Sequence, residues 1–104
     1  MVENLDFNGL NVTYCYDKFL IQLDKPLSEQ IWELNEDIIQ LQIDNKYTID
    51  LGYYPSHTLN GKFKVCIIKD SEWSNPIWIK TCKSQNILFN LLQEAIDVVK
   101  KMSL

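Results

Sequence analysis

Arginine is absent from this chain of 104 residues, and all ten of its basic residues are lysines. Guanidinium is the group best suited to bidentate recognition of phosphate and guanine. With 14 acidic residues the formal net charge is -4, so a nucleic-acid backbone would repel the surface. We therefore do not expect nucleic-acid binding, and a basic protein is the more natural partner.

Histidine, glycine, proline and cysteine are also scarce. His57 is the only histidine, and three glycines and three prolines leave little room for flexible linkers. Cys15, Cys66 and Cys82 form no CxxC pair, so we expect buried free thiols rather than a zinc site. No metal ion or other cofactor is expected.

Long apolar stretches are missing as well. No run approaches the ~18 residues that a membrane span requires, and residues 1–6 lack the basic and apolar regions of a signal peptide. We therefore expect a cytoplasmic protein without a membrane contact. Hydrophobic residues make up 46% of the chain, enough for one core, which predicts a single domain over residues 1–104.

Alternating apolar and polar residues predict the strands. The segments 12–16 and 19–23 both alternate, and they form either a tight hairpin or one long bent strand. Residues 47–54 and 62–69 alternate on either side of Asn60-Gly61, which is a strong hairpin signal. A further short strand is predicted over 77–82.

Two helices are predicted. Ser28 is a good N-cap, and the apolar residues after it recur every three or four positions, which indicates a helix over 28–43. Residues 39–43 also alternate, so they are either the end of this helix or a strand. Ser84 caps the second helix, which runs to about Met102. The fold class is α+β, an antiparallel sheet of about five strands with two helices packed on it.

Catalytic side chains do not gather in the sequence. His57 lies in a hairpin loop beside Ser56 and Thr58, and neighbours in sequence do not make a catalytic triad. Asp50 and Asp70 flank the central hairpin without a signature of glycoside or metal chemistry. No glycine-rich loop precedes a helix. We therefore do not expect an enzyme.

Acidic residues follow helical spacing in the first predicted helix. Glu29, Glu33, Glu36, Asp37 and Asp44 would form a negative stripe opposite the apolar positions. The stripe is either the solvated face of the helix or a row of carboxylates that meets lysines and arginines of a partner.

Aromatic residues are numerous, with three tryptophans and five tyrosines. Trp32 and Trp78 lie within predicted elements, so we expect them in the core or half-buried. Tyr53, Tyr54 and Trp73 lie at strand ends or in turns, where they either pack corners or anchor an interface.

The second half of the chain carries an ordered set of motifs. A strand ends in Gly52-Tyr53-Tyr54-Pro55, the return strand begins at Asn60-Gly61, an acidic turn over 69–76 carries a tryptophan and a proline, and a helix follows. This pattern covers roughly residues 47–99. It resembles small bacterial immunity proteins that are encoded beside contact-dependent growth-inhibition and related polymorphic toxins.

The resemblance implies a cytoplasmic protein that binds the C-terminal domain of one cognate toxin and blocks it. Many such toxins are nucleases with basic grooves, and the acidic, arginine-free composition agrees with that role. Two other classes stay open: a small intracellular adaptor or regulatory domain, and an enzyme or ligand binder with a deep pocket at His57. The candidate partner-binding residues are Glu29, Glu33, Glu36, Asp37, Tyr53, Tyr54, Asp70, Glu72 and Trp73.

Overall fold

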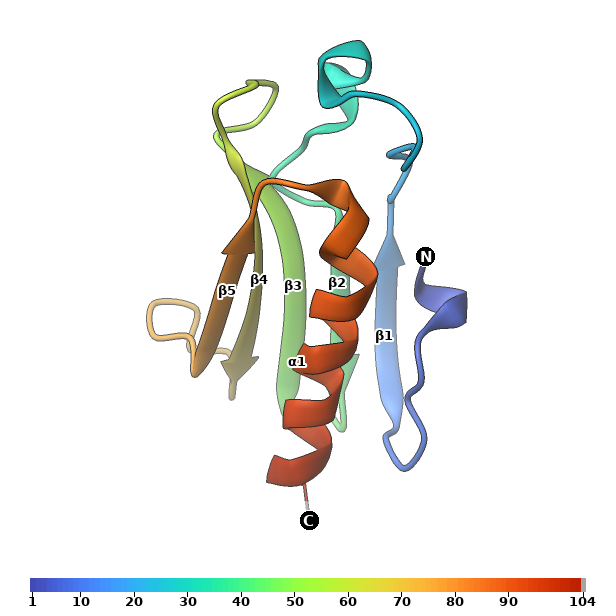
Figure 1. Ribbon diagram of the computed structural model, residues 1–104. Helices are drawn as coiled ribbons and strands as arrows, with labels where there is room; N and C mark the ends of the chain where they lie inside the picture. The colour runs from blue at the N-terminus through green and yellow to red at the C-terminus, as the bar shows by residue number, and fades with distance from the viewer. Residues whose placement is uncertain (104) are drawn as a thin grey trace.

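Five strands pair in the order in which they follow one another along the chain (Figure 1). The computed structural model describes residues 1–103. All neighbouring strands are antiparallel, and the predicted hairpin around Asn60-Gly61 is confirmed because the strands on either side of it pair over their full lengths. The strands are β1 (Val12–Asp17), β2 (Ile39–Ile43), β3 (Tyr47–Tyr54), β4 (Lys62–Lys69) and β5 (Trp78–Cys82).

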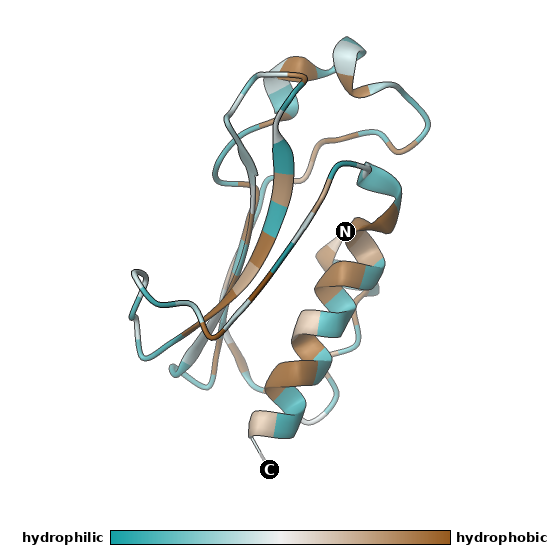
Figure 2. Cartoon of the chain, turned by 60° about the vertical axis from the view of Figure 1, so that its left-hand side comes forward, coloured by the Kyte–Doolittle hydropathy of each residue, from teal (hydrophilic) through white to brown (hydrophobic). Residues whose placement is uncertain are grey.

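One α-helix, α1 (Leu88–Met102), packs across one face of the sheet, as predicted for the segment after Ser84 (Figures 1 and 2). A short 3-10 turn, η4 (Gln85–Ile87), precedes it, and the Ser84 hydroxyl accepts a hydrogen bond from the Asn86 backbone N–H at 3.2 Å. No helix within residues 1–103 has the length and apolar character needed to cross a membrane.

The hydrophobic core fills the space between α1 and the sheet. Strand alternation turns every second residue of β2, β3 and β4 toward the helix. These side chains are Ile39, Leu41, Ile43, Tyr47, Ile49, Leu51, Tyr53, Phe63, Val65 and Ile67. From α1, Leu92 and Ile96 are fully buried against them. The chain therefore forms a single α+β layer pair with one core.

The start of the chain is tied to the same helix. It begins with a 3-10 turn, η1 (Val2–Asn4), after which Leu5 joins the core. The Asp6 backbone N–H donates to Gln93 Oε1 at 2.8 Å, and Gln93 Nε2 donates to the Asp6 carbonyl at 3.0 Å. Lys100 Nζ lies 3.5 Å from the Asp6 carboxylate. These contacts fix the N-terminal segment beside α1.

The helix predicted over 28–43 is wrong. This part of the chain forms two 3-10 turns, η2 (Leu27–Glu29) and η3 (Ile31–Glu33), an extended segment and then β2, so the strand interpretation of 39–43 is confirmed. β2 lies between β1 and β3 and buries its alternate residues. Pairing with two neighbouring strands outweighs the local three-and-four spacing, because propensity is a weak prior against tertiary context. Within residues 1–103 the sheet therefore carries one α-helix rather than two.

The segment 19–23 is not a strand either. Ile21 is buried, whereas Leu20 and Leu23 are exposed. In place of a strand partner, the Gln30 side chain holds the segment: its Nε2 donates to the Gln22 carbonyl at 2.8 Å, and its Oε1 accepts from the Gln22 N–H at 2.7 Å. The alternation over 19–23 thus belongs to a loop with one buried anchor.

The three cysteines are free thiols in different surroundings. Cys66 is buried, as expected, whereas Cys82 is only half-buried. Cys15 is exposed, which corrects the expectation of a buried thiol, because β1 is an edge strand and only one strand flanks it.

Candidate functional site

The face of the sheet opposite α1 carries no helix within the described residues (Figure 2). Over β1, β2 and β3, strand alternation places polar and aromatic side chains there, whereas β4 and β5 add Ile68 and Ile79. Tyr14 and Tyr16 of β1 lie opposite Gln42 and Gln40 of β2, and Asp50 of β3 lies opposite Gln40 on the other side. This uncovered face is therefore suited to contact with another molecule.

A cavity of about 300 Å³ opens on this face. It is lined by Tyr14, Tyr16, Asp37, Ile39, Gln40 and Asp50. A wider and more open depression of about 580 Å³ adjoins it, shares Tyr16 and Asp37 with it, and adds Glu33 and Glu36. We call the surface formed by Tyr14, Tyr16, Glu33, Glu36, Asp37 and Asp50 the acidic face.

Gly52 allows two of these acids to reach the sheet. Backbone hydrogen bonds of 2.8 and 3.0 Å tie residues 35–38 to β3, so the segment runs close along this strand. A Cβ on Gly52 would collide with the backbone carbonyl of Glu36 and lie 2.8 Å from the ring of Tyr54. Only glycine leaves this space, and the close approach brings Glu36 and Asp37 beside the uncovered face.

Tyr54 also contacts the segment 35–38. Its hydroxyl donates to the Glu36 carbonyl at 3.2 Å, and Lys64 Nζ lies 4.5 Å from the centre of its ring. Burial and, after it, the negative charges of Asp50 and Asp37 raise the pKa of Tyr54 to about 12. The hydroxyl therefore stays neutral and remains a hydrogen-bond donor near neutral pH.

Asp50 is the most buried acid of the acidic face, with 7% of its surface exposed. Burial and, after it, the charge of Asp37 raise the pKa of Asp50 to about 6, while Lys64 and the Gln40 amide act in the opposite direction. The ion pairs found in residues 1–103 all involve other carboxylates. Asp50 thus lines a cavity as a buried carboxylate without a counter-ion. A raised carboxyl pKa in a cavity is typical of functional sites.

Four of the nine predicted contact residues gather here. Glu33, Glu36 and Asp37 line the open depression, although they lie on a turn and an extended segment and not on a helix face. Tyr54 borders the same surface through its hydrogen bond to Glu36.

Two other predicted residues do not belong to the acidic face. Glu29 lies in η2 and lines neither depression. Tyr53 is 1% exposed, packs edge-on against Phe63 and donates its hydroxyl to the Thr58 carbonyl at 2.7 Å. Of its two predicted uses, packing is confirmed and the interface anchor is wrong, because strand alternation turns Tyr53 toward α1 with the other core residues of β3.

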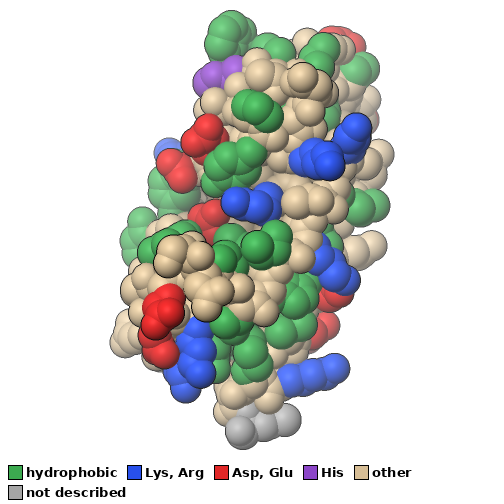
Figure 3. Space-filling view, turned by 90° about the vertical axis from the view of Figure 1, so that its left-hand side faces the viewer, with side chains coloured by type: hydrophobic (Ala, Val, Ile, Leu, Met, Phe, Trp, Pro, Cys, Tyr) green, Lys and Arg blue, Asp and Glu red, His purple; other side chains and the backbone are tan. Residues whose placement is uncertain are grey.

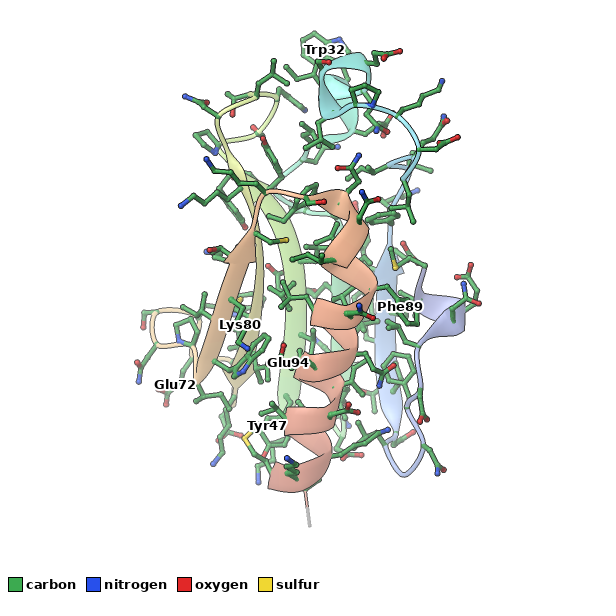
Figure 4. All side chains as sticks on the ribbon, in the orientation of Figure 1. Trp32, Tyr47, Glu72, Lys80, Phe89 and Glu94 are labelled. Atoms are coloured by element: carbon green, nitrogen blue, oxygen red, sulfur yellow. The ribbon has the colours of Figure 1, made fainter. Side chains whose placement is uncertain are left out.

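Asp70, Glu72 and Trp73 follow β4 in the loop before β5, at the other end of the sheet from η3 (Figure 4). The Asp70 N–H donates to the Lys46 carbonyl at 2.8 Å, beside the turn between β2 and β3. At ~3.3 Å per residue, β3 separates this turn from Tyr54 by roughly 23 Å. The nine residues therefore do not form one interface.

Trp32 is a surface residue that sequence reasoning misplaced. It lies in η3 and is 74% exposed, which corrects the expectation that it packs in or near the core, whereas Trp78 is half-buried against the core as expected. The Trp32 ring lies 5.2 Å from the ring of His57, whose Nε2 is 2.8 Å from Asn35 Oδ1. His57 thus joins η3 to the loop after β3. No sequence signal marked Trp32 as exposed, because its place within the predicted helix suggested a core or half-buried position.

Tyr14, Tyr16 and Asp50 were also missed as site residues. The tyrosines belong to the alternating segment 12–16, and Asp50 lies in a predicted strand without a signature of glycoside or metal chemistry. Their meeting depends on the register of β1, β2 and β3, which no local pattern contains.

The β5 edge differs from the acidic face. Ile77 and Ile79 are 44% and 50% exposed there, and Figure 3 shows hydrophobic side chains interspersed with lysines on this side. Lys80 of β5 pairs with Glu94 of α1 (Figure 4). Lysines on an edge strand oppose pairing with a further strand. The acidic face and the β5 edge are thus distinct surfaces.

Comparisons with protein-family models, with curated proteins and with solved structures gave no significant match. No group of three or more histidine, cysteine or acidic side chains within residues 1–103 is placed to hold a metal ion.

Proposed function

We propose that this protein binds and neutralises a basic toxin domain in the cytoplasm, as immunity proteins do, and that the acidic face makes the contact. The observation that supports this is the gathering of four carboxylates on one uncovered side of the sheet. Lys18 and Lys64 are the neighbouring cations. Inhibition by binding requires no catalytic group of the protein's own.

Electrostatic complementarity gives the acidic face its expected role. A nuclease binds phosphates in a basic groove, and carboxylates presented in a row would occupy that groove in their place. Such complementarity raises the association rate and selects the partner more than it raises affinity. The proposal therefore predicts fast, salt-sensitive binding.

An aromatic anchor beside the acids would supply the affinity. Trp32 precedes Glu33 in η3 and is exposed, and tryptophan is enriched among the residues that dominate interfaces. Tyr14 and Tyr16 offer further aromatic surface next to the carboxylates. We include all three in the proposed contact.

Binding kinetics test the proposal. The partner is sought first in the product of the adjacent upstream gene, by co-purification. The variant Glu33→Lys/Asp37→Lys is compared with Asp70→Lys/Glu72→Lys, which makes the same change of charge at the other end of the sheet. We expect the first variant to associate about tenfold more slowly at low salt, with a flatter salt dependence, and the second to change little.

Truncation of the anchor tests the other part of the contact. Trp32→Ala is expected to raise the dissociation rate about 30-fold, equivalent to about 2 kcal/mol, without changing the salt dependence. Equal effects of the two charge-reversed variants, or full protection of toxin-expressing cells by Glu33→Lys/Asp37→Lys, would contradict the proposed surface. Binding of a basic protein that is not a toxin would favour the adaptor function.

A further inference from the structure

We infer that the 300 Å³ cavity between Tyr14, Tyr16, Asp37 and Asp50 receives one guanidinium group, the head of an arginine side chain. Where that arginine belongs to the toxin, the inference rests on the proposed function. The cavity is nevertheless defined by this chain alone, so a small guanidinium compound probes it without any partner.

The cavity has ample room for a side-chain head. Sites for whole small-molecule ligands span about 300–1,000 Å³, so this cavity lies at the lower limit. It opens into the wider depression through their shared residues, Tyr16 and Asp37. A side chain that projects from a protein bound over the depression would therefore enter it.

The negative charge of the cavity favours the binding of a cation. Asp50 is more than nine-tenths buried, and the ion pairs of residues 1–103 include neither Asp50 nor Asp37. A buried carboxylate without a counter-ion is costly, and a second carboxylate beside it adds repulsion. The lining residues carry no positive charge. A bound cation would offset both the cost of burying the Asp50 charge and its repulsion from Asp37.

The surrounding groups do not already fill this role. The positive charge of Lys64 lowers the pKa of Asp50. However, the Lys64 ammonium group lies over the Tyr54 ring and makes no ion pair with the Asp50 carboxylate. Gln40 favours the charged form of Asp50 from the opposite strand. Tyr54 and Cys66, which also face Asp50, both have raised pKa values and stay neutral near pH 7. The net charge of the cavity is therefore negative once Asp50 is ionised.

Guanidinium suits this cavity better than ammonium. Its planar fork donates two parallel hydrogen bonds to a carboxylate, and it is more weakly hydrated, so entry into a partly buried site costs less. Its faces stack on aromatic rings, and two tyrosines line the cavity. An ammonium ion has neither the fork nor the flat faces.

The test is a titration of the intact protein followed by NMR, with three probes of similar size. N-ethylguanidinium is expected to shift the Tyr14 and Tyr16 ring signals in a saturable way, with a Kd on the order of millimolar. The n-propylammonium ion is expected to bind at least fivefold more weakly, and neutral N-ethylurea not to bind. Equal binding of the ammonium ion or the urea would overturn the guanidinium assignment.

Variants locate the probe. Asp50→Asn and, separately, Asp37→Asn are each expected to weaken N-ethylguanidinium binding about tenfold, whereas Asp70→Asn at the far end of the sheet leaves it unchanged. Asp37 is exposed, so its variant keeps the test valid if Asp50→Asn disturbs folding. Unchanged binding in Asp37→Asn would overturn the inference.

The pH dependence gives a further readout. Because the Asp50 carboxyl loses its charge below about pH 6, the affinity of the wild-type protein should fall several-fold between about pH 7.5 and pH 5, and this fall should be smaller in Asp50→Asn. If the probe binds as expected but no basic toxin does, the proposed function fails and the inference stands. If the toxin binds and Asp37→Asn leaves both toxin and probe binding unchanged, the inference fails alone.

Discussion

Asp50 and Gly52 stand two positions apart on the same side of β3, and the segment before β2 constrains both. The Glu36 carbonyl occupies the space where Gly52 lacks a side chain, and the charge of Asp37 acts on Asp50. Gly52 therefore permits the close approach of the segment, and Asp50 experiences the repulsion from Asp37 that this approach creates. Substitutions at the two positions should separate these roles.

Gly52→Ala is expected to destabilise the fold by about 1–3 kcal/mol, because its methyl group would have to displace backbone atoms of Glu36 and not a flexible side chain. Urea denaturation measures the loss. Thr81→Ala on the exposed part of β5 is the control and should stay within about 0.5 kcal/mol of wild type. A Gly52→Ala protein as stable as wild type would show that the segment over β3 yields easily.

Asp50 should make the protein less stable as pH rises. Its raised pKa means that the folded state holds the proton more tightly than the unfolded chain, so the free energy of unfolding falls between about pH 4 and pH 6 and is level above that. Asp50→Asn removes this fall in the free energy of unfolding. Its stability relative to wild type should therefore be higher near pH 7 than near pH 4. Urea midpoints across this range measure it.

Asp6 provides a contrast of opposite sign. The backbone N–H of Asn8 and, after it, the charge of Lys100 lower the pKa of Asp6, so its contribution to stability is present at neutral pH and lost as pH falls. Asp6→Asn should therefore lower the free energy of unfolding near pH 7, and in acid its free energy of unfolding should approach that of the wild-type protein. The same slope for both aspartate variants would contradict the assignment of Asp50.

The helix α1 depends on its stripe of buried apolar side chains. Leu92→Ala or Ile96→Ala should cost about 2–5 kcal/mol, because both side chains are fully buried against the sheet and their removal leaves a cavity. Asn90→Ala on the exposed side of the helix is the matched control and should change stability by less than about 0.5 kcal/mol. Denaturant unfolding checks both, and equal losses would mean that the helix packs by another face.

The elements that could be predicted from sequence are those with local signals. The Ser84 cap and the apolar stripe after it mark α1, and Asn60-Gly61 marks the β3–β4 hairpin. The segment 28–43 satisfies a helical spacing by chance, and what decides its structure is pairing with β1 and β3, which lie on either side of it in the sheet. Local patterns carry no information about such partners.

The same reasoning explains how much of the candidate site could be predicted. Glu33, Glu36 and Asp37 are visible as a run of acids, whatever structure they adopt. Asp50 and the tyrosines of β1 become site residues only because β2 lies between their strands and the 35–38 segment crosses Gly52. Tyr53 and Tyr54 are adjacent in sequence, yet alternation sends one into the core and the other to the surface.

The helix α1 is the main cover of the apolar side of the sheet within residues 1–103. A fragment that ends at residue 83 lacks η4 and α1 and exposes the core residues of β2, β3 and β4. We expect it to show no cooperative unfolding transition and to bind a hydrophobic dye. A peptide of residues 84–104 added to the fragment should restore the transition, and a fragment that folds alone would show that the sheet is stable without its helix.

The position of α1 after all five strands also affects the order of events during synthesis. Each strand pairs with its predecessor in the chain, so the sheet can assemble as it leaves the ribosome. α1 is made after all five strands, so until it docks the assembled sheet presents its apolar side to solvent. A delay between pairing of the strands and docking of α1 would prolong the exposure, and chaperone binding to the chain should be strongest in that interval.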